Sequence, residues 1–257
     1  MKKWLFLLCA LLPLTLFADE IVRKKIKVGG YMWSPFIELH GRNYQGLTLD
    51  LIDAANTAQG DFEFEFVLTT AENRHKDFYH KKFDMIFLED IDWGWNAYPV
   101  AASTPLAKGT ELYIALNKNE RTQVFFQDMA EKSISMVKGF HYAFAQNNTN
   151  EAYLKEHFKE IRLHADPTDV LQDVLQGKSE IGVINSLTLE SEMARNPKIK
   201  DHILIGKKFD QDFVLSILAR KDSPMTIEQV NLLIERLKKE GMMAKLWEKY
   251  KMDPKVK

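Results

Sequence analysis

The sequence is short of cysteine. Its 257 residues contain a single one, Cys9, so the chain can form no internal disulfide and must be stabilised by its core. A strong charge of either sign is also missing, because 35 basic residues stand against 36 acidic ones. A net formal charge of -1 gives no field to attract nucleic acid or an anionic membrane surface. We therefore expect a small solute or a protein as the partner.

The N-terminus has the pattern of a secretory signal peptide. Two lysines precede an apolar run from Trp4 to Phe17, and Ala18 then stands just before acidic residues. The run is short for a membrane span and contains Pro13, which argues against an uncleaved anchor. We expect cleavage after Ala18, removal of residues 1–18, and a mature protein in the periplasm.

Short apolar segments alternate with amphipathic ones in two successive units, which is typical of an α/β fold. The expected strands cover 26–30, 62–67, 83–88, 133–137, 161–163 and 181–184. The expected helices cover 46–58, 151–158, 167–175 and 227–237, with a last one around 246–250. Two more extended segments, 112–116 and 213–219, could each cross between the two units.

Six segments, taken in order, carry a resemblance to a known family. They are Val28 to Phe36 with its Ser34-Pro35-Phe36, Gly46 to Leu51, Phe83 to Ile86, Ser103 to Leu106, Leu175 to Ile184, and Leu237 to Tyr250. In this order and spacing they resemble solute-binding proteins of family 3, the amino-acid-type binding proteins of ABC transporters. The resemblance extends over essentially all of the chain after residue 18.

The resemblance implies a two-lobed α/β fold with two hinge strands. Lobe 1 would contain 19–113 and 219–257, and lobe 2 would contain 114–218 with the hinge strands. Such a monomer closes over a solute by hinge rotation, and an ABC transporter permease or a membrane sensor reads the closed form. The resemblance implies no enzymatic activity and no cofactor. The histidines lack metal-ligand spacing, so we also predict no metal site.

Both charged positions that the family uses to hold an α-amino acid differ in this sequence. The resemblance places the arginine that clamps the α-carboxylate at about Asn96, and the aspartate that receives the α-ammonium at Asn185. No Arg or Lys occurs between Lys82 and Lys108, so a small shift of the alignment does not restore the clamp. These two differences argue against a standard α-amino acid, and we expect a small polar solute that could be cationic.

The loop after the strand at 83–88 is the most informative candidate for ligand contact. Three carboxylates and two indoles lie close together there: Glu89, Asp90, Asp92, Trp93 and Trp95. Aromatic faces beside carboxylates favour a cationic solute. Burial of the rings would serve a neutral solute equally well, and a solvated acidic loop with packed tryptophans is the alternative.

Two other loops supply the remaining candidates, by their place in the resemblance. Tyr31, Trp33 and Phe36 lie in the first lobe-1 ligand loop, where core packing is the competing interpretation. Phe140 and His141 follow Gly139 at the start of the second unit, where free backbone N–H groups could hold an anion.

Three functional classes follow from these observations. The first is solute capture for a transporter or sensor. The second is a periplasmic dehydratase of the cyclohexadienyl type on the same fold, with Glu89, Asp90 or Asp92 as the acid. The third is an accessory that binds a protein and whose own cleft is filled.

Overall fold

The computed structural model describes residues 23–118 and 121–256, so the predicted signal peptide lies outside the described residues. The strands are β1 (Lys24–Gly30), β2 (Glu38–His40), β3 (Asn43–Gln45), β4 (Phe62–Leu68), β5 (Met85–Glu89), β6 (Val100–Ala102), β7 (Ala107–Leu116), β8 (Ser133–Val137), β9 (Glu160–His164), β10 (Ile181–Asn185) and β11 (Ile203–Arg220). The helices are α1 (Leu47–Ala58), α2 (Arg74–Tyr79), α3 (Glu151–His157), α4 (Pro167–Leu175), α5 (Ser186–Arg195), α6 (Ile199–His202), α7 (Ile227–Lys239) and α8 (Met242–Lys249).

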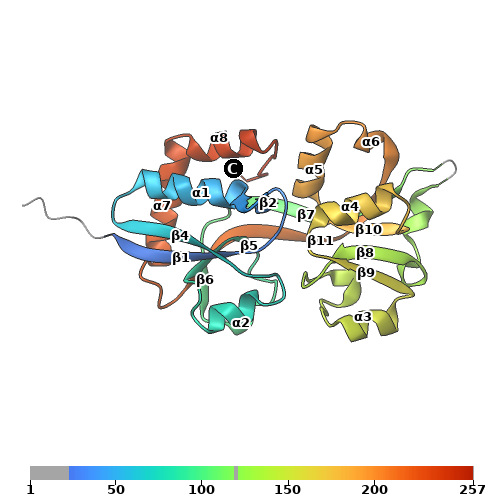
Figure 1. The fold of residues 1–257 in the computed structure, drawn as a ribbon, viewed down its shortest axis with the longest axis horizontal. Coiled ribbons are helices and arrows are strands. Elements are labelled where there is room, and N and C mark those ends of the chain that lie inside the picture. Colours follow the sequence, from blue (N-terminus) through green and yellow to red (C-terminus); the bar gives the residue numbers. More distant parts are fainter. Residues whose placement is uncertain (1–22, 119–120, 257) are drawn as a thin grey trace, which may run out of the picture.

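One lobe, which we call lobe 1, is built around β1, which lies between β4 and β5 and runs parallel to both. Ile26 and Val28 of β1 are fully buried, as expected for an interior parallel strand covered on both faces. Helices α1, α7 and α8 pack against one another, and α2 lies on the opposite side of the sheet from α1 and α8 (Figure 1).

Lobe 2 repeats this arrangement with β8 between β9 and β10, all three parallel. Helices α4 and α5 lie on one side of its sheet and α3 on the other (Figure 1). Helix α4 begins at Pro167, and the preceding Asp166 caps it by accepting a hydrogen bond from the backbone N–H of Thr168. Helix α5 begins directly after β10, so Asn185 is both the end of the strand and the helix cap.

Two strands run from one lobe to the other (Figure 1). The first part of β11 pairs with β7, and its last residues pair with β5 and β6 of lobe 1. β10 of lobe 2 pairs antiparallel with the other edge of β7. The result is one mixed sheet in the order β4-β1-β5-β11-β7-β10-β8-β9. These two strands contain the segments predicted at 112–116 and 213–219. β7 begins five residues before its predicted segment, and β11 begins ten residues before its own and ends one residue after it.

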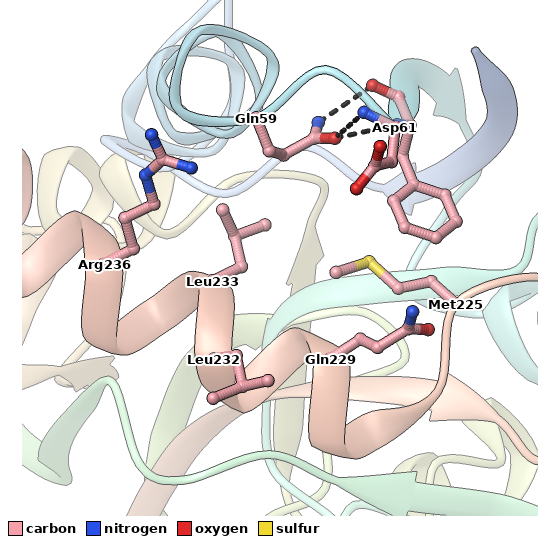
Figure 2. Close-up of a pocket in the computed structure, with 8 residues that line it drawn as sticks. Gln59, Asp61, Met225, Gln229, Leu232, Leu233 and Arg236 are labelled. Atoms are coloured by element: carbon pink, nitrogen blue, oxygen red, sulfur yellow. Dashed lines mark hydrogen bonds between the residues drawn. The ribbon is translucent and has the colours of Figure 1, made fainter.

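A groove is present on the outer side of lobe 1, between α7 and the turn that joins α1 to β4 (Figure 2). Its lining comes from this lobe alone and includes Gln59, Phe62, Met225 and Leu233. None of the described helices is long and apolar enough to cross a membrane.

Candidate functional site

The two lobes are hydrogen-bonded to each other through the loop that follows β1. The backbone N–H of Ser34 donates to the Asp166 carboxylate at 2.9 Å, and the Ser34 carbonyl accepts from the Thr188 hydroxyl at 2.5 Å. Arg195 of lobe 2 also pairs with Glu38 at 3.0 Å. Because both polar groups of the Ser34 backbone are held by lobe 2, the structure describes a closed arrangement of the lobes.

Two cavities open along this seam, and Met32 lines both. One, of about 310 Å³, lies between Glu72 of lobe 1 and Lys138 of lobe 2, which are paired at 2.9 Å. The other, of about 430 Å³, is lined by residues such as Glu38 and Asp166. Met32 stands in the chain between Tyr31 and Trp33, whose buried rings belong to the centre of the molecule.

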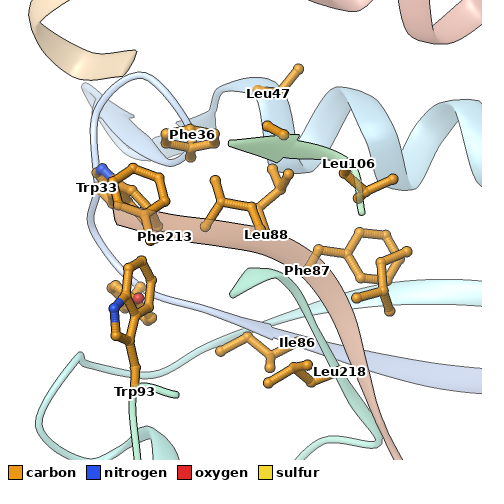
Figure 3. Packing of buried hydrophobic residues seen from close by; sticks show 14 of the residues in the cluster. Trp33, Phe36, Leu47, Ile86, Phe87, Leu88, Trp93, Leu106, Phe213 and Leu218 are labelled. Atoms are coloured by element: carbon orange, nitrogen blue, oxygen red, sulfur yellow. The ribbon is translucent and has the colours of Figure 1, made fainter. Parts of the chain in front are cut away.

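Six aromatic rings meet at that centre and form what we call the central cluster. They are Tyr31, Trp33, Phe36, Trp93, Phe140 and Phe213, and each is at most 7% exposed. Trp33 lies 5.7 Å from both Trp93 and Phe140, measured between ring centroids, and Phe213 lies 5.5 Å from Trp93 (Figure 3). The structure therefore brings together five predicted residues from both lobes. Phe213 of β11 was not predicted.

The cluster is bordered by a buried ion pair between Arg74 and Glu89, whose side chains are each 1% exposed. The Glu89 carboxylate accepts from Arg74 Nε at 2.7 Å, Trp95 Nε1 at 2.9 Å and the Tyr31 hydroxyl at 2.8 Å. Burial raises the pKa of Glu89, while the Arg74 charge and these donors oppose the rise. Since every group bonded to it is a donor, we take Glu89 as ionised and neutralised by Arg74.

Arg74 also connects the lobes. It stands at the start of α2 and donates to the Gly139 carbonyl of lobe 2 at 3.0 Å, and its guanidinium lies 3.3 Å from Nδ1 of His141. Burial, and then the Arg74 charge, lower the pKa of His141 to about 4, so this half-buried imidazole is uncharged at neutral pH. Arg74 was not predicted, because the resemblance places the family's arginine after β5 and not before it.

The rest of the acidic loop is bonded within lobe 1 or to the crossing strand β11, or faces solvent. The Asp90 carboxylate accepts from the backbone N–H groups of Asp92 and Val214. Asp92 and Asn96 are exposed and hydrogen-bonded to each other at 3.1 Å. Trp95 is fully buried and packs on Phe78 with 5.1 Å between ring centroids. The structure thus does not bring Asp92, Trp95 or Asn96 into the central cluster.

Asn185 lies on the lobe-2 side of the seam with one free donor. Its carboxamide oxygen accepts from the Thr188 N–H at 2.7 Å, while its Nδ2 is buried without a partner in the described part of the chain. Trp33 Nε1 is a second buried donor that has no partner among these residues. Buried donors are nearly always satisfied in native proteins, so both call for an explanation.

Glu111 of β7 is the most unusual acidic residue of the structure, and it was not predicted. It is 2% exposed, and burial followed by the charge of Asp210 raises its pKa to about 8. Among residues 23–118 and 121–256 its carboxyl group has no hydrogen-bond or ion-pair partner. The sequence did contain a signal for a buried acid. Glu111 stands between Gly109 and Tyr113 on the buried face of a strand whose burial alternates.

No group of three or more His, Cys, Asp or Glu side chains that could hold a metal ion is found in the described residues. No curated protein matches the sequence. The chain is similar in structure to a putative binding component of an ABC transporter from Wolinella succinogenes DSM 1740 complexed with lysine. That match has a TM-score of 0.70 and 18% identity, and covers 91% of this chain and 98% of the other.

A mutant of ArgBP from T. maritima is similar at a TM-score of 0.66 and 20% identity, with 88% of this chain and 94% of that one covered. An ancestral amino acid-binding protein, described as a precursor of cyclohexadienyl dehydratase, is similar at 0.65 and 21% identity, with 88% and 95% covered. These likenesses confirm the predicted two-lobed α/β fold. The family model of bacterial extracellular solute-binding proteins, family 3, matches residues 26–253, and the chain therefore belongs to that family.

Proposed function

We propose that this protein captures a small solute with a cationic group between its lobes, and that a transporter permease or a membrane sensor in the same cell envelope reads the closed form. One observation carries the proposal. The loop 31–36, which brings Tyr31, Trp33 and Phe36 into the central cluster, is the same loop whose Ser34 backbone is bonded by lobe 2. A solute held under this loop would therefore change the free energy of closing directly.

The balance of buried charges favours a cation. Arg74 is neutralised by Glu89, and Glu111 has no cationic partner among the described residues. Within residues 23–118 and 121–256, an anionic substrate would find no free positive charge beside the central cluster. This argues against the alternative of a cyclohexadienyl-type dehydratase, although Glu111 would supply a protonated acid at neutral pH.

A second candidate function is favoured by the packing of the rings. Trp33 of lobe 1 and Phe140 of lobe 2 are in edge-to-face contact at 5.7 Å and expose almost no surface. A protein whose resting form is closed in this way could serve a protein partner without any solute. Solute capture requires in contrast that the lobes separate and the rings part.

The test is a ligand panel measured on the purified protein by thermal melting, calorimetry and small-angle scattering. The panel contains polyamines, basic and neutral amino acids, aromatic acids and prephenate-like compounds. For solute capture at a concentration 100 times the Kd, the stability gain of about 2.7 kcal/mol raises the Tm by roughly 5–10 °C. The radius of gyration should also fall when the solute is added, without turnover.

Turnover of a prephenate-like compound would establish the dehydratase alternative. A panel without any Tm shift, together with a radius of gyration that matches the closed structure in the absence of solute, would favour the protein-facing role.

A further inference from the structure

Glu111 and Asn185 lie side by side on the face of the sheet that carries the central cluster. They are direct partners in the antiparallel pairing of β7 with β10, and such partners project to the same face with Cβ atoms about 5 Å apart. Gly109 stands two residues before Glu111 and so shares this face. The Phe213 ring covers it so closely that a Cβ added at Gly109 would lie 2.2 Å from the ring. Phe213 in turn packs against Trp33 at 6.5 Å.

Once Glu111 is ionised, the groups that surround it in the described residues supply no positive charge to balance it. On the β11 side it pairs with Gln211, whose side chain donates to the His141 carbonyl. The nearest acid, Asp210, is already bonded by the Tyr113 hydroxyl and by two backbone N–H groups of the 143–144 turn. Burial raises the pKa of Tyr142, and the Glu111 charge is the next cause of that rise. Burial also raises the pKa of Tyr31, where Glu89 contributes more than Glu111 does. No cation in the described residues offsets the Glu111 charge.

Two buried donors without a partner in the described residues accompany this acid. The orientation of the Asn185 carboxamide is fixed by the bond from the Thr188 N–H to its oxygen, so the buried atom without a partner is the NH₂ group. The Trp33 indole N–H is the other. Glu111 is the direct cross-strand partner of Asn185, and Phe213, which covers Gly109 on the same face, packs on Trp33. These contacts bring the acid and the two donors into one region of the molecule.

This step rests on the proposed function and names its ligand class. We propose that Glu111 receives the ammonium group of the solute, and that Asn185 and Trp33 donate hydrogen bonds to an uncharged oxygen of the same molecule. The class is a small amine with an amide, hydroxyl or ether oxygen and without a free carboxylate. A free carboxylate is disfavoured because Arg74 is already bonded to Glu89 and to the Gly139 carbonyl.

The test uses matched probes in isothermal calorimetry. L-Leucinamide and L-phenylalaninamide are each compared with the parent amino acid, which adds the carboxylate, and with the deaminated amide, which lacks the ammonium. We expect the two amino acid amides to bind at least about tenfold more tightly than either relative, as for the loss of one charge-assisted hydrogen bond. Their affinity should rise about tenfold from pH 6 to pH 7, because Glu111, with a pKa of about 8, must lose its proton to bind a cation.

Two variants complete the test. Glu111→Gln removes the charge with little change in shape and should weaken binding of the amides at least about tenfold, and Trp33→Phe should weaken it while retaining a ring. Glu235→Gln, on the exposed face of α7, is the matched control and should bind as the unmodified protein does.

The outcomes separate the two levels of the proposal. Parent amino acids that bind as tightly as their amides, or an affinity that Glu111→Gln leaves unchanged, would overturn the assignment of Glu111 and leave solute capture standing. Absence of binding by every probe and by the wider panel would overturn both.

Discussion

Glu111 should make the protein less stable as the pH rises. Its pKa is about 8 in the folded state and 4.5 when the group is free of its surroundings. Below pH 4.5 the carboxyl is protonated in both states, so nothing is lost. Between pH 4.5 and 8 the unfolded chain releases this proton more readily than the folded protein does. Stability is therefore present below pH 4.5 and lost progressively up to pH 8.

The size of the loss follows from the difference in pKa. A shift of 8 minus 4.5, or 3.5, at 1.36 kcal/mol for each pKa unit, corresponds to about 5 kcal/mol at pH 9 and to about 3 kcal/mol at pH 7. Glu111→Gln keeps the size of the side chain and cannot ionise. The variant should therefore equal the unmodified protein in stability near pH 4 and exceed it by an amount that grows toward pH 9.

Urea unfolding at pH 4.5, 7 and 9, followed by tryptophan fluorescence and by circular dichroism, measures this difference. Coincidence of the two probes checks that a single transition is observed. Glu235→Gln serves as the control, since its exposed side chain should give a difference that does not change with pH. A stability difference for Glu111→Gln that is the same at pH 4.5 and pH 9 would refute the reasoning.

Three further predictions concern the surroundings of the site. Arg74→Met leaves Glu89 buried without its cation and should cost about 3–5 kcal/mol in urea unfolding, whereas adding Glu89→Leu to that variant should recover part of the loss. Gly109→Ala places a Cβ 2.2 Å from the Phe213 ring and should lower the free energy of unfolding by about 1–3 kcal/mol. An unchanged Tm in thermal melting would contradict this and show that the ring shifts freely. The pKa values of His75 and His141 are lowered to about 3 and about 4, first of all by burial, so their contribution to stability is present above pH 6.5 and lost on acidification toward pH 4. His141→Gln should therefore lose less in Tm between pH 7 and pH 4.5 than the unmodified protein, and an equal loss would contradict this.

Most of the fold could be predicted because its elements carry strong local patterns. The helix predicted at 227–237 is α7, Ile227–Lys239, where the apolar spacing and the Thr226 capping box agree. The strand predicted at 181–184 is β10, which is buried along its whole length. Helix α2 was missed because six largely polar residues show no period. Strand β11 was predicted only at 213–219, because its middle, residues 207–212, is mostly polar and its earlier residues are held by pairing with β7, which is information from elsewhere in the chain.

The site was predicted only where residue type and loop position were sufficient. Aromatic side chains such as Trp33 and Phe140 are usually buried. A correct prediction of where their loops lie was therefore enough to predict that the rings are close to each other. Carboxylates are different, because neighbouring acids can have unlike surroundings. Glu89 is paired with an arginine, Asp90 accepts from backbone N–H groups, and Asp92 is exposed to solvent, although the three stand within four residues. These environments depend on contacts with Arg74 and Val214. Neither contact can be predicted from the position of the acids in the sequence.

The long strand β11 has a consequence for the order of folding. The last residues of β11 pair with β5 and β6 of lobe 1, and its earlier residues pair with β7. The mixed sheet is therefore not complete before residue 220 is available. Contacts between β5 and β11 join residues more than 120 positions apart, and such non-local pairing slows folding. The chain should therefore not reach its complete native structure until most of it has left the ribosome. A chain that is still unfolded at that stage can pass through a narrow channel.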